Sequence, residues 1–140
     1  LFRSSRGFTD PEEARRFEAE TGVDWLSVSV GNIHGAISGA AKSSTKVQAR
    51  LSIPHLQRLR GMVSVPLVLH GGSGIQKSFV LEGIRNGIAK INVGTAIRQA
   101  YEASMADAGA AEQAVFLAVR QVLVDELEVA GSARRLNPPS

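Results

Sequence analysis

Two histidines are the side chains best placed for chemistry in this sequence, because each closely follows a predicted strand and precedes a glycine. His34 follows the apolar segment at residues 25–30, and His70 ends the apolar run at residues 65–69. Neighbouring parallel strands lie about 4.8 Å apart, so imidazoles at their ends can converge on one ion. Neutral imidazole is a common zinc ligand, and a catalytic zinc takes three protein ligands and keeps one position open. The pair predicts a zinc site, with two unrelated polar residues at strand ends as the alternative.

A glycine-rich turn follows His70 and leads into a predicted helix. Gly71, Gly72 and Ser73 form this turn together with Gly74. Glycine lets backbone N–H groups approach a ligand closely, and a helix N-terminus carries partial positive charge, so the combination favours an anion. The turn therefore predicts a phosphate site with Ser73 as a hydroxyl donor. A plain tight turn would use the same glycines.

Polar residues also follow the third predicted strand. Asn92, Val93, Gly94 and Thr95 form the turn after it, and Arg98 lies one helical turn further on. The Asn92 side chain could hold a substrate oxygen, and the N–H groups of Gly94 and Thr95 begin a helix. Arg98 could reach a phosphate. The alternatives are an ordinary strand-to-helix turn capped by Thr95 and a surface arginine.

Carboxylates are missing from the predicted strand ends. Asp10, Asp24, Asp107 and Asp125 lie at helix starts, before a strand or within helices. A side chain for general acid–base catalysis is therefore not visible in this segment. The third histidine, His55, lies on the polar side of a predicted helix, and we expect it at the surface.

Hydrophobic periodicity and turn residues place these candidates on alternating helices and strands. Asp10 or Thr9 can cap a first helix that has Pro11 in its first turn, and Gly22 ends it. The predicted elements are this helix, strands at residues 25–30, 65–69 and 88–93, and helices starting near residues 52, 76, 95 and 110, the last ending near 130. Helical spacing predicts inward-facing side chains, among them Phe17, Ile84, Tyr101 and Met105.

Strands that alternate with helices are typical of βαβ units and a parallel sheet. Each predicted strand is nearly all apolar, as expected when both faces of a sheet are covered. A complete (β/α)8 barrel needs about 250 residues, and this chain has 140. We therefore predict an α/β fold made of the last three βα units of a TIM (β/α)8 barrel plus a C-terminal helix. The candidate residues all follow strand C-termini, where such barrels keep their active sites.

Composition excludes several classes of protein. The chain has no cysteine, so it has neither a disulfide framework nor a thiolate metal site. Its net charge of +3 comes from scattered basic residues with few aromatics, which argues against a nucleic-acid-binding surface. No apolar run approaches the roughly 20 residues of a membrane span. We expect a cytoplasmic protein with no nucleic-acid or membrane partner, and, from the loop-like start at Leu1, a piece of a longer chain.

Three segments together resemble the class II, zinc-dependent fructose-bisphosphate aldolase family, which includes the tagatose-bisphosphate aldolases. They are VSVGNIHG at residues 28–35, PLVLHGGSGI at 66–75 and AKINVGT at 89–95. One such motif alone would not be specific, but three in the right order, each at a strand end, are. The resemblance runs from Thr9 to about Tyr101 and implies that residues 1–140 are the C-terminal portion of a single aldolase TIM-barrel domain.

The resemblance implies a reaction and a set of site residues. The reaction is reversible aldol cleavage of a ketose 1,6-bisphosphate, in glycolysis or related carbohydrate metabolism, to dihydroxyacetone phosphate and an aldehyde such as glyceraldehyde 3-phosphate. Zn²⁺ would polarise the ketone and stabilise the enediolate. By motif match, His34 and His70 would bind zinc. The residues expected to bind substrate are Gly35, Gly71, Gly72, Ser73, Asn92, Val93, Gly94 and Thr95, with Arg98 on the other phosphate.

The family's catalytic aspartate and a neighbouring zinc-binding histidine lie in an earlier strand that this sequence lacks. The resemblance therefore assigns no catalytic residue to the segment, which we expect to be inactive alone, and it implies a homo-oligomer, either a dimer or a tetramer. Gly94 stands where fructose-specific members often have an aspartate, and Ser38 stands where a lysine is common. The resemblance therefore does not distinguish fructose from tagatose or another ketose bisphosphate. The alternatives are a metal-independent TIM-barrel phosphosugar lyase or isomerase, and a non-catalytic phosphosugar-binding protein.

Overall fold

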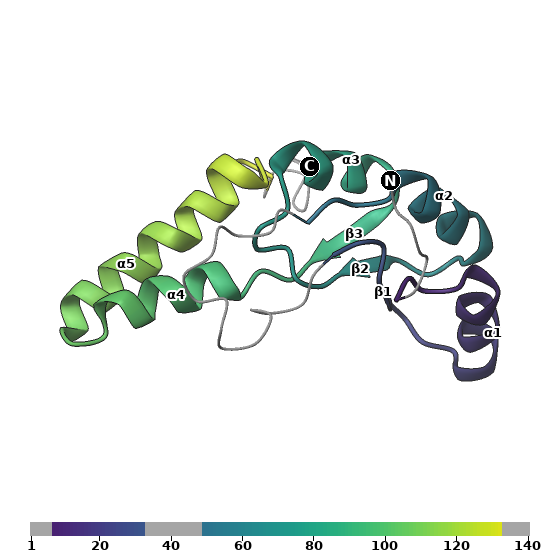
Figure 1. Cartoon of the computed structure of the whole chain (residues 1–140), viewed down its shortest axis with the longest axis horizontal. Coiled ribbons are helices and arrows are strands. Elements are labelled where there is room, and N and C mark those ends of the chain that lie inside the picture. The colour runs from purple at the N-terminus through teal and green to yellow at the C-terminus, as the bar shows by residue number, and fades with distance from the viewer. Residues whose placement is uncertain (1–6, 33–48, 133–140) are drawn as a thin grey trace, which may run out of the picture. The chain divides into compact units, whose positions relative to one another are not determined.

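The computed structural model describes residues 7–32 and 49–132 of the chain (Figure 1). The elements in chain order are α1 (Pro11–Thr21), β1 (Leu26–Val28), α2 (Ile53–Met62), β2 (Leu67–Leu69), α3 (Lys77–Arg85), β3 (Ile88–Ile91), α4 (Thr95–Ser104), α5 (Ala108–Gln121) and a π-helical turn, Val122–Glu126. They fall into two compact units, the first ending at Gly94 and the second beginning at Thr95. The predicted alternation of strands and helices in an α/β fold is confirmed.

The three strands form one parallel sheet in the order β1-β2-β3, with β2 in the middle. Residues in register share a face of a parallel sheet. One face carries Leu26, Val28, Leu67, Leu69, Ile88 and Ile91, and the other carries Ser27, Val68 and Lys90. The first face packs into the main core, where Leu56 and Leu59 of α2 are fully buried. α3 lies against β3 and α2.

The prediction that every strand is covered on both faces holds only for β2, whose three residues are all buried. Ser27 of β1 and Lys90 of β3 are exposed on the second face. The strands themselves are shorter than predicted, and single backbone hydrogen bonds from Leu26 to Pro66 and from Asn92 to Leu69 continue the pairing at their ends. An apolar run indicates burial, but it does not show where backbone pairing stops.

The first helix begins and ends as its sequence predicts. The Asp10 side chain accepts hydrogen bonds from the N–H groups of Glu12 and Glu13, at 2.9 and 3.0 Å, and Pro11 is the first helical residue. Gly22 ends the helix in the left-handed region, with φ of 63°. Capping is local, so a few adjacent residues are enough to specify it.

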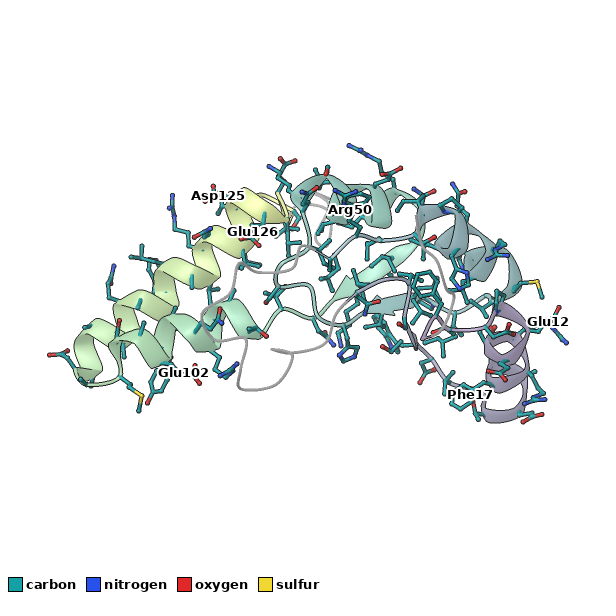
Figure 2. All side chains as sticks on the ribbon, viewed as in Figure 1. Glu12, Phe17, Arg50, Glu102, Asp125 and Glu126 are labelled. Carbon is teal, nitrogen blue, oxygen red and sulfur yellow. The ribbon has the colours of Figure 1, made fainter. Side chains whose placement is uncertain are left out.

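Several side chains predicted to face inward are exposed instead. Phe17 is 48% exposed on α1 (Figure 2), and Ile84, Tyr101 and Met105 are also exposed. Helical spacing identifies residues that share a face, but burial needs a second element on that face. Within the described residues, these four side chains are covered only in part, with exposed fractions of 41–63%. The last helix is also shorter than predicted, because α5 passes into the π-helical turn and ends well before residue 130.

His55 is buried, which contradicts the expectation of a surface histidine. It is 6% exposed, and its ring lies 5.0 Å from that of Phe8. Its Nε2 lies 2.8 Å from the carbonyl oxygen of Thr9, and its Nδ1 lies 2.8 Å from Nη2 of Arg58. A carbonyl only accepts and a guanidinium only donates, so Nε2 donates to Thr9 and Nδ1 accepts from Arg58. His55 therefore joins α2 to the segment before α1.

Glu18 joins α1 to the loop that precedes β2. The Ser64 hydroxyl donates to its carboxylate, and the N–H groups of Ser64 and Val65 donate at 3.1 and 3.2 Å. The Ser64 hydroxyl is the largest cause that holds the pKa of Glu18 below its ordinary value. The backbone donors and Arg60 act in the same direction, and desolvation opposes them.

We predict that Glu18→Gln removes a pH-dependent part of the stability. Because folding lowers the pKa of Glu18, the ionised carboxylate stabilises the fold above the ordinary glutamate pKa of about 4.3. That contribution is lost as the pH falls through the lowered pKa. Thermal unfolding of both proteins from pH 7 to pH 3 should show a Tm difference that is largest at neutral pH and shrinks in acid.

The matched control for this prediction is Glu20→Gln on the same helix. Glu20 makes only an exposed ion pair with Arg16, at 3.7 Å, and such pairs contribute little. A Glu18→Gln profile that runs parallel to wild type at every pH would contradict the assignment.

Candidate functional site

In the first unit the structure brings together predicted site residues from two of the three motif segments, 66–75 and 89–95. His70 directly follows β2, the turn Gly71–Gly72–Ser73 comes next, and Asn92 directly follows β3. His34 and Gly35 lie outside the described residues. Thr95 and Arg98 belong to α4 in the second unit.

Asn92 lies against the imidazole of His70. Its Nδ2 is 3.1 Å from Nε2 and 3.3 Å from Nδ1 of the ring. An amide NH₂ only donates, so it pairs with whichever ring nitrogen carries the lone pair. The Asn92 amide thus contacts the half-buried ring of His70 at both nitrogens.

The backbone of Asn92 fixes it against the end of β2. Its N–H donates to the carbonyl of Leu69 at 2.9 Å, and its own carbonyl accepts from the N–H of Gly72 at 3.1 Å. One residue at the end of β3 is therefore bonded both to β2 and to the glycine turn. The imidazole and the turn are held in fixed relation through Asn92.

Gly72 is required by close packing. A Cβ atom built at this position would lie 2.7 Å from Cγ2 of Ile91, 3.1 Å from Cγ2 of Val93 and 3.3 Å from the carbonyl oxygen of Asn92. Both methyl groups belong to β-branched side chains, which have little rotamer freedom. Any larger residue would push the turn away from β3.

The rest of the turn has a backbone suited to binding an anion. Gly71 and Gly74 have φ values of 69° and 92°, which glycine adopts without strain. α3 begins at Lys77, just after the turn, and its first turn contains no acidic residue. The helix dipole there is therefore not neutralised by a carboxylate on the same turn.

Asn32 also contacts His70, although the sequence pattern does not predict Asn32 as a site residue. Its Nδ2 donates to the main-chain carbonyl of His70 at 2.9 Å, across 38 residues of sequence. Its Oδ1 accepts from the N–H of Val30 at 2.9 Å. The one signal in the sequence is that Asn32 lies two residues before His34 in the 28–35 motif.

Arg98 pairs with Glu102 one turn further along α4. Both side chains are about half exposed. An i,i+4 pair of this kind is an ordinary feature of a helix surface. The role of Arg98 in phosphate binding stays a prediction.

The donor chemistry of the described residues fits part of a zinc site. His70 supplies an imidazole beside a hydrogen-bond donor, whereas no group of three or more His, Cys, Asp or Glu side chains converges in residues 7–32 and 49–132. A complete ligand set would need donors beyond these residues.

In the same part of the chain, residues 7–32 and 49–132, no helix is both long and apolar enough to cross a membrane.

The family model for class II fructose-bisphosphate aldolases matches residues 2–135. This α/β chain, with a histidine and a glycine turn at the end of its central strand, belongs to the class II fructose-bisphosphate aldolase family. The resemblance carried by the three motifs is thereby confirmed.

Solved structures agree with this assignment. The YdjI aldolase from Escherichia coli K12 is 35% identical, with a TM-score of 0.69 over 89% of this chain and 46% of that one. A proposed fructose-1,6-bisphosphate aldolase from Coccidioides immitis is 28% identical, with a TM-score of 0.75 over 91% and 46%. The chain spans less than half the length of each. Its three parallel strands and their helices match part of the aldolase fold.

We predict that Gly72→Ala destabilises the protein by about 1–3 kcal/mol, the usual range for overpacking. The added methyl group would meet Ile91 and Val93 at less than normal contact distance. The measurement is the free energy of unfolding from urea titrations. The control is Gly61→Ala in α2, where an added Cβ meets nothing within 4 Å and helix propensity favours alanine by about 1 kcal/mol. Equal effects of the two substitutions would contradict the close packing at Gly72.

Proposed function

We propose that this chain is the C-terminal portion, residues 1–140, of the TIM-barrel domain of a class II ketose-bisphosphate aldolase. The reaction would be the reversible cleavage of a ketose 1,6-bisphosphate to dihydroxyacetone phosphate and an aldehyde. The observation that carries this proposal is the arrangement at the ends of β2 and β3. There, Asn92 contacts the His70 imidazole and at the same time bonds to the N–H of Gly72 in the glycine turn.

Two features support the proposal that this chain is part of a larger barrel. The chain spans 46% of the two aldolase structures that it resembles at 28% identity or more. Ser27 and Lys90 are also exposed on the second face of the sheet, and that face would line the interior of a closed barrel. We expect the whole protein to be a cytoplasmic homo-oligomer, a dimer or a tetramer.

The metal site in this proposal consists of His34, His70 and a third ligand from outside the chain. Zinc, when bound, acts as a Lewis acid that polarises the substrate carbonyl. Asn92 would keep the His70 imidazole in place through its contact with the ring, and its amide also lies where a substrate oxygen could accept a hydrogen bond.

The proposed phosphate site is the turn at Gly71, Gly72 and Ser73. Close packing at Gly72 brings this backbone against β3, where Val93, Gly94 and the N–H of Thr95 follow Asn92. Gly35 would contribute from the segment after β1, and Arg98 would bind the other phosphate once released from Glu102. These residues would bind and orient the substrate, whereas proton transfer needs a carboxylate from elsewhere in the protein.

The identity of the sugar depends in part on Gly94. Its φ is not in the positive region, so the backbone there would accept any residue. The absence of a side chain at Gly94 is thus a chemical difference from members with an aspartate, and not a requirement of the turn. We therefore propose a ketose bisphosphate substrate and leave fructose and tagatose as the two sugars to compare.

We predict about one zinc per chain in the full-length protein purified without chelator, with cleavage of fructose or tagatose 1,6-bisphosphate that EDTA abolishes. His34→Ala and His70→Ala should each cause the zinc content to collapse. The control is His55→Gln, because the ring of His55 contacts Thr9 and Arg58, and neither is a candidate site residue. Zinc content unchanged by the first two substitutions would favour a metal-independent lyase or isomerase. An inactive, zinc-free protein that binds dihydroxyacetone phosphate would be a phosphosugar-binding protein.

The 140-residue chain by itself is predicted to show no turnover with zinc and either sugar. Its aspartates Asp10 and Asp107 cap helices, and no described strand ends in a carboxylate. The measurement is a coupled assay for dihydroxyacetone phosphate, with the full-length protein as the positive control. Zinc-dependent cleavage by the chain alone would show that it contains its own proton-transfer group.

A further inference from the structure

We propose that Asn32 is a positioning residue that sets the orientation of the His70 imidazole through the main chain. This inference rests on the proposed function, in which His70 binds zinc. Asn32 contacts the carbonyl of the same residue, so any effect on the ring must pass through the backbone of His70.

The Asn32 amide continues the β1–β2 pairing beyond its last backbone pair. The ladder between the two strands ends at Val28 and Leu69. One residue further, the His70 carbonyl accepts from Asn32 Nδ2 at 2.9 Å. The other end of the same amide accepts from the N–H of Val30 at 2.9 Å. A side chain therefore bridges the ends of the two strands where backbone pairing has stopped.

The backbone conformation at Gly31 allows the Asn32 side chain to make both of these contacts. Gly31 has a φ of 107°, a conformation that glycine adopts readily and other residues adopt rarely. The turn at Gly31 lets the side chain of the next residue reach back to Val30 and across to β2. The ring of His70 is contacted by Asn92, which directly follows β3. The residue is therefore held at its carbonyl by the segment after β1 and at its ring by the segment after β3.

Only an amide of this length supplies both contacts. Aspartate would accept from Val30 but present a second oxygen to the His70 carbonyl, and alanine would make neither bond. Groups that orient a metal ligand typically change metal affinity by 10- to 100-fold when removed. Because Asn32 acts through the backbone, we expect an effect at the lower end of that range.

The first measurement uses the metal-free full-length protein and the ¹⁵N signals of its histidine rings. His70 signals, assigned from their loss in His70→Gln, should shift or broaden in both Asn32→Ala and Asn32→Asp. His55 is an internal reference, because its ring is held by Thr9 and Arg58. Its signals should not move.

The matched control is Asn86→Ala. Asn86 also bridges two elements through both ends of its amide, since it accepts from Gln57 at 2.8 Å and donates to the carbonyl of Glu82 at 2.8 Å. It lies at the C-terminus of α3, away from the strand ends that hold the site. Its loss should lower Tm to a similar extent and leave the His70 signals unchanged.

The second measurement is zinc affinity by competition with a chromophoric chelator. Asn32→Ala and Asn32→Asp should each raise the zinc dissociation constant about ten-fold, and Asn86→Ala should leave it unchanged. Equal loss in the two Asn32 variants would assign the effect to the His70 contact, because aspartate keeps the acceptor for Val30.

The outcomes separate this inference from the proposed function. If both Asn32 variants lower Tm but leave the His70 ring signals as in wild type, Asn32 only stabilises the fold, and the inference is overturned. If the wild-type protein binds no zinc, the proposed function fails, and the ring signals of the metal-free protein alone decide whether Asn32 positions His70. Shifted ring signals in both Asn32 variants support the inference, and a ten-fold weaker zinc affinity would show that this orientation also matters for metal binding.

Discussion

Backbone pairing at the C-terminal end of β2 is the constraint on which the candidate site depends. β2 is the middle strand of a parallel sheet, and its residues Leu67–Leu69 are all buried. Buried peptide groups need hydrogen-bond partners, and within the strand the two neighbours supply them. At His70 the ladder with β1 has ended, so the side chain of Asn32 takes its place. On the other side, the N–H of Asn92 still pairs with Leu69.

Close packing also fixes the glycine turn against this strand end. Gly72 has no side chain, so its N–H can reach the carbonyl of Asn92 while Ile91 and Val93 close over the position. The segment before α1 is joined to the same edge, because Thr9 exchanges hydrogen bonds with Ser29 just beyond β1, at 2.9 and 2.8 Å. His55 in turn bonds to the Thr9 carbonyl. These bonds join α2 and the segment before α1 to the chain just beyond β1.

Much of the fold follows from the sequence because its determinants are local. The cap at Asp10, the stop at Gly22 and the short apolar run of β2 each depend on a few adjacent residues. The alternation of strands and helices predicts a parallel sheet, whose strands all end at one edge. The same rule predicts that His70, the glycine turn and Asn92 come together, and the structure confirms it.

The sequence by itself therefore determined the order and type of the elements, the strand-end position of the candidate residues and membership of an aldolase family. Only the tertiary structure decided which helix faces are covered, as the buried His55 and the exposed Phe17 demonstrate. It also revealed the bond from Asn32 to His70, between residues 38 apart in the chain. Periodicity states which side chains share a face, whereas burial and long-range hydrogen bonds depend on what another segment places against that face.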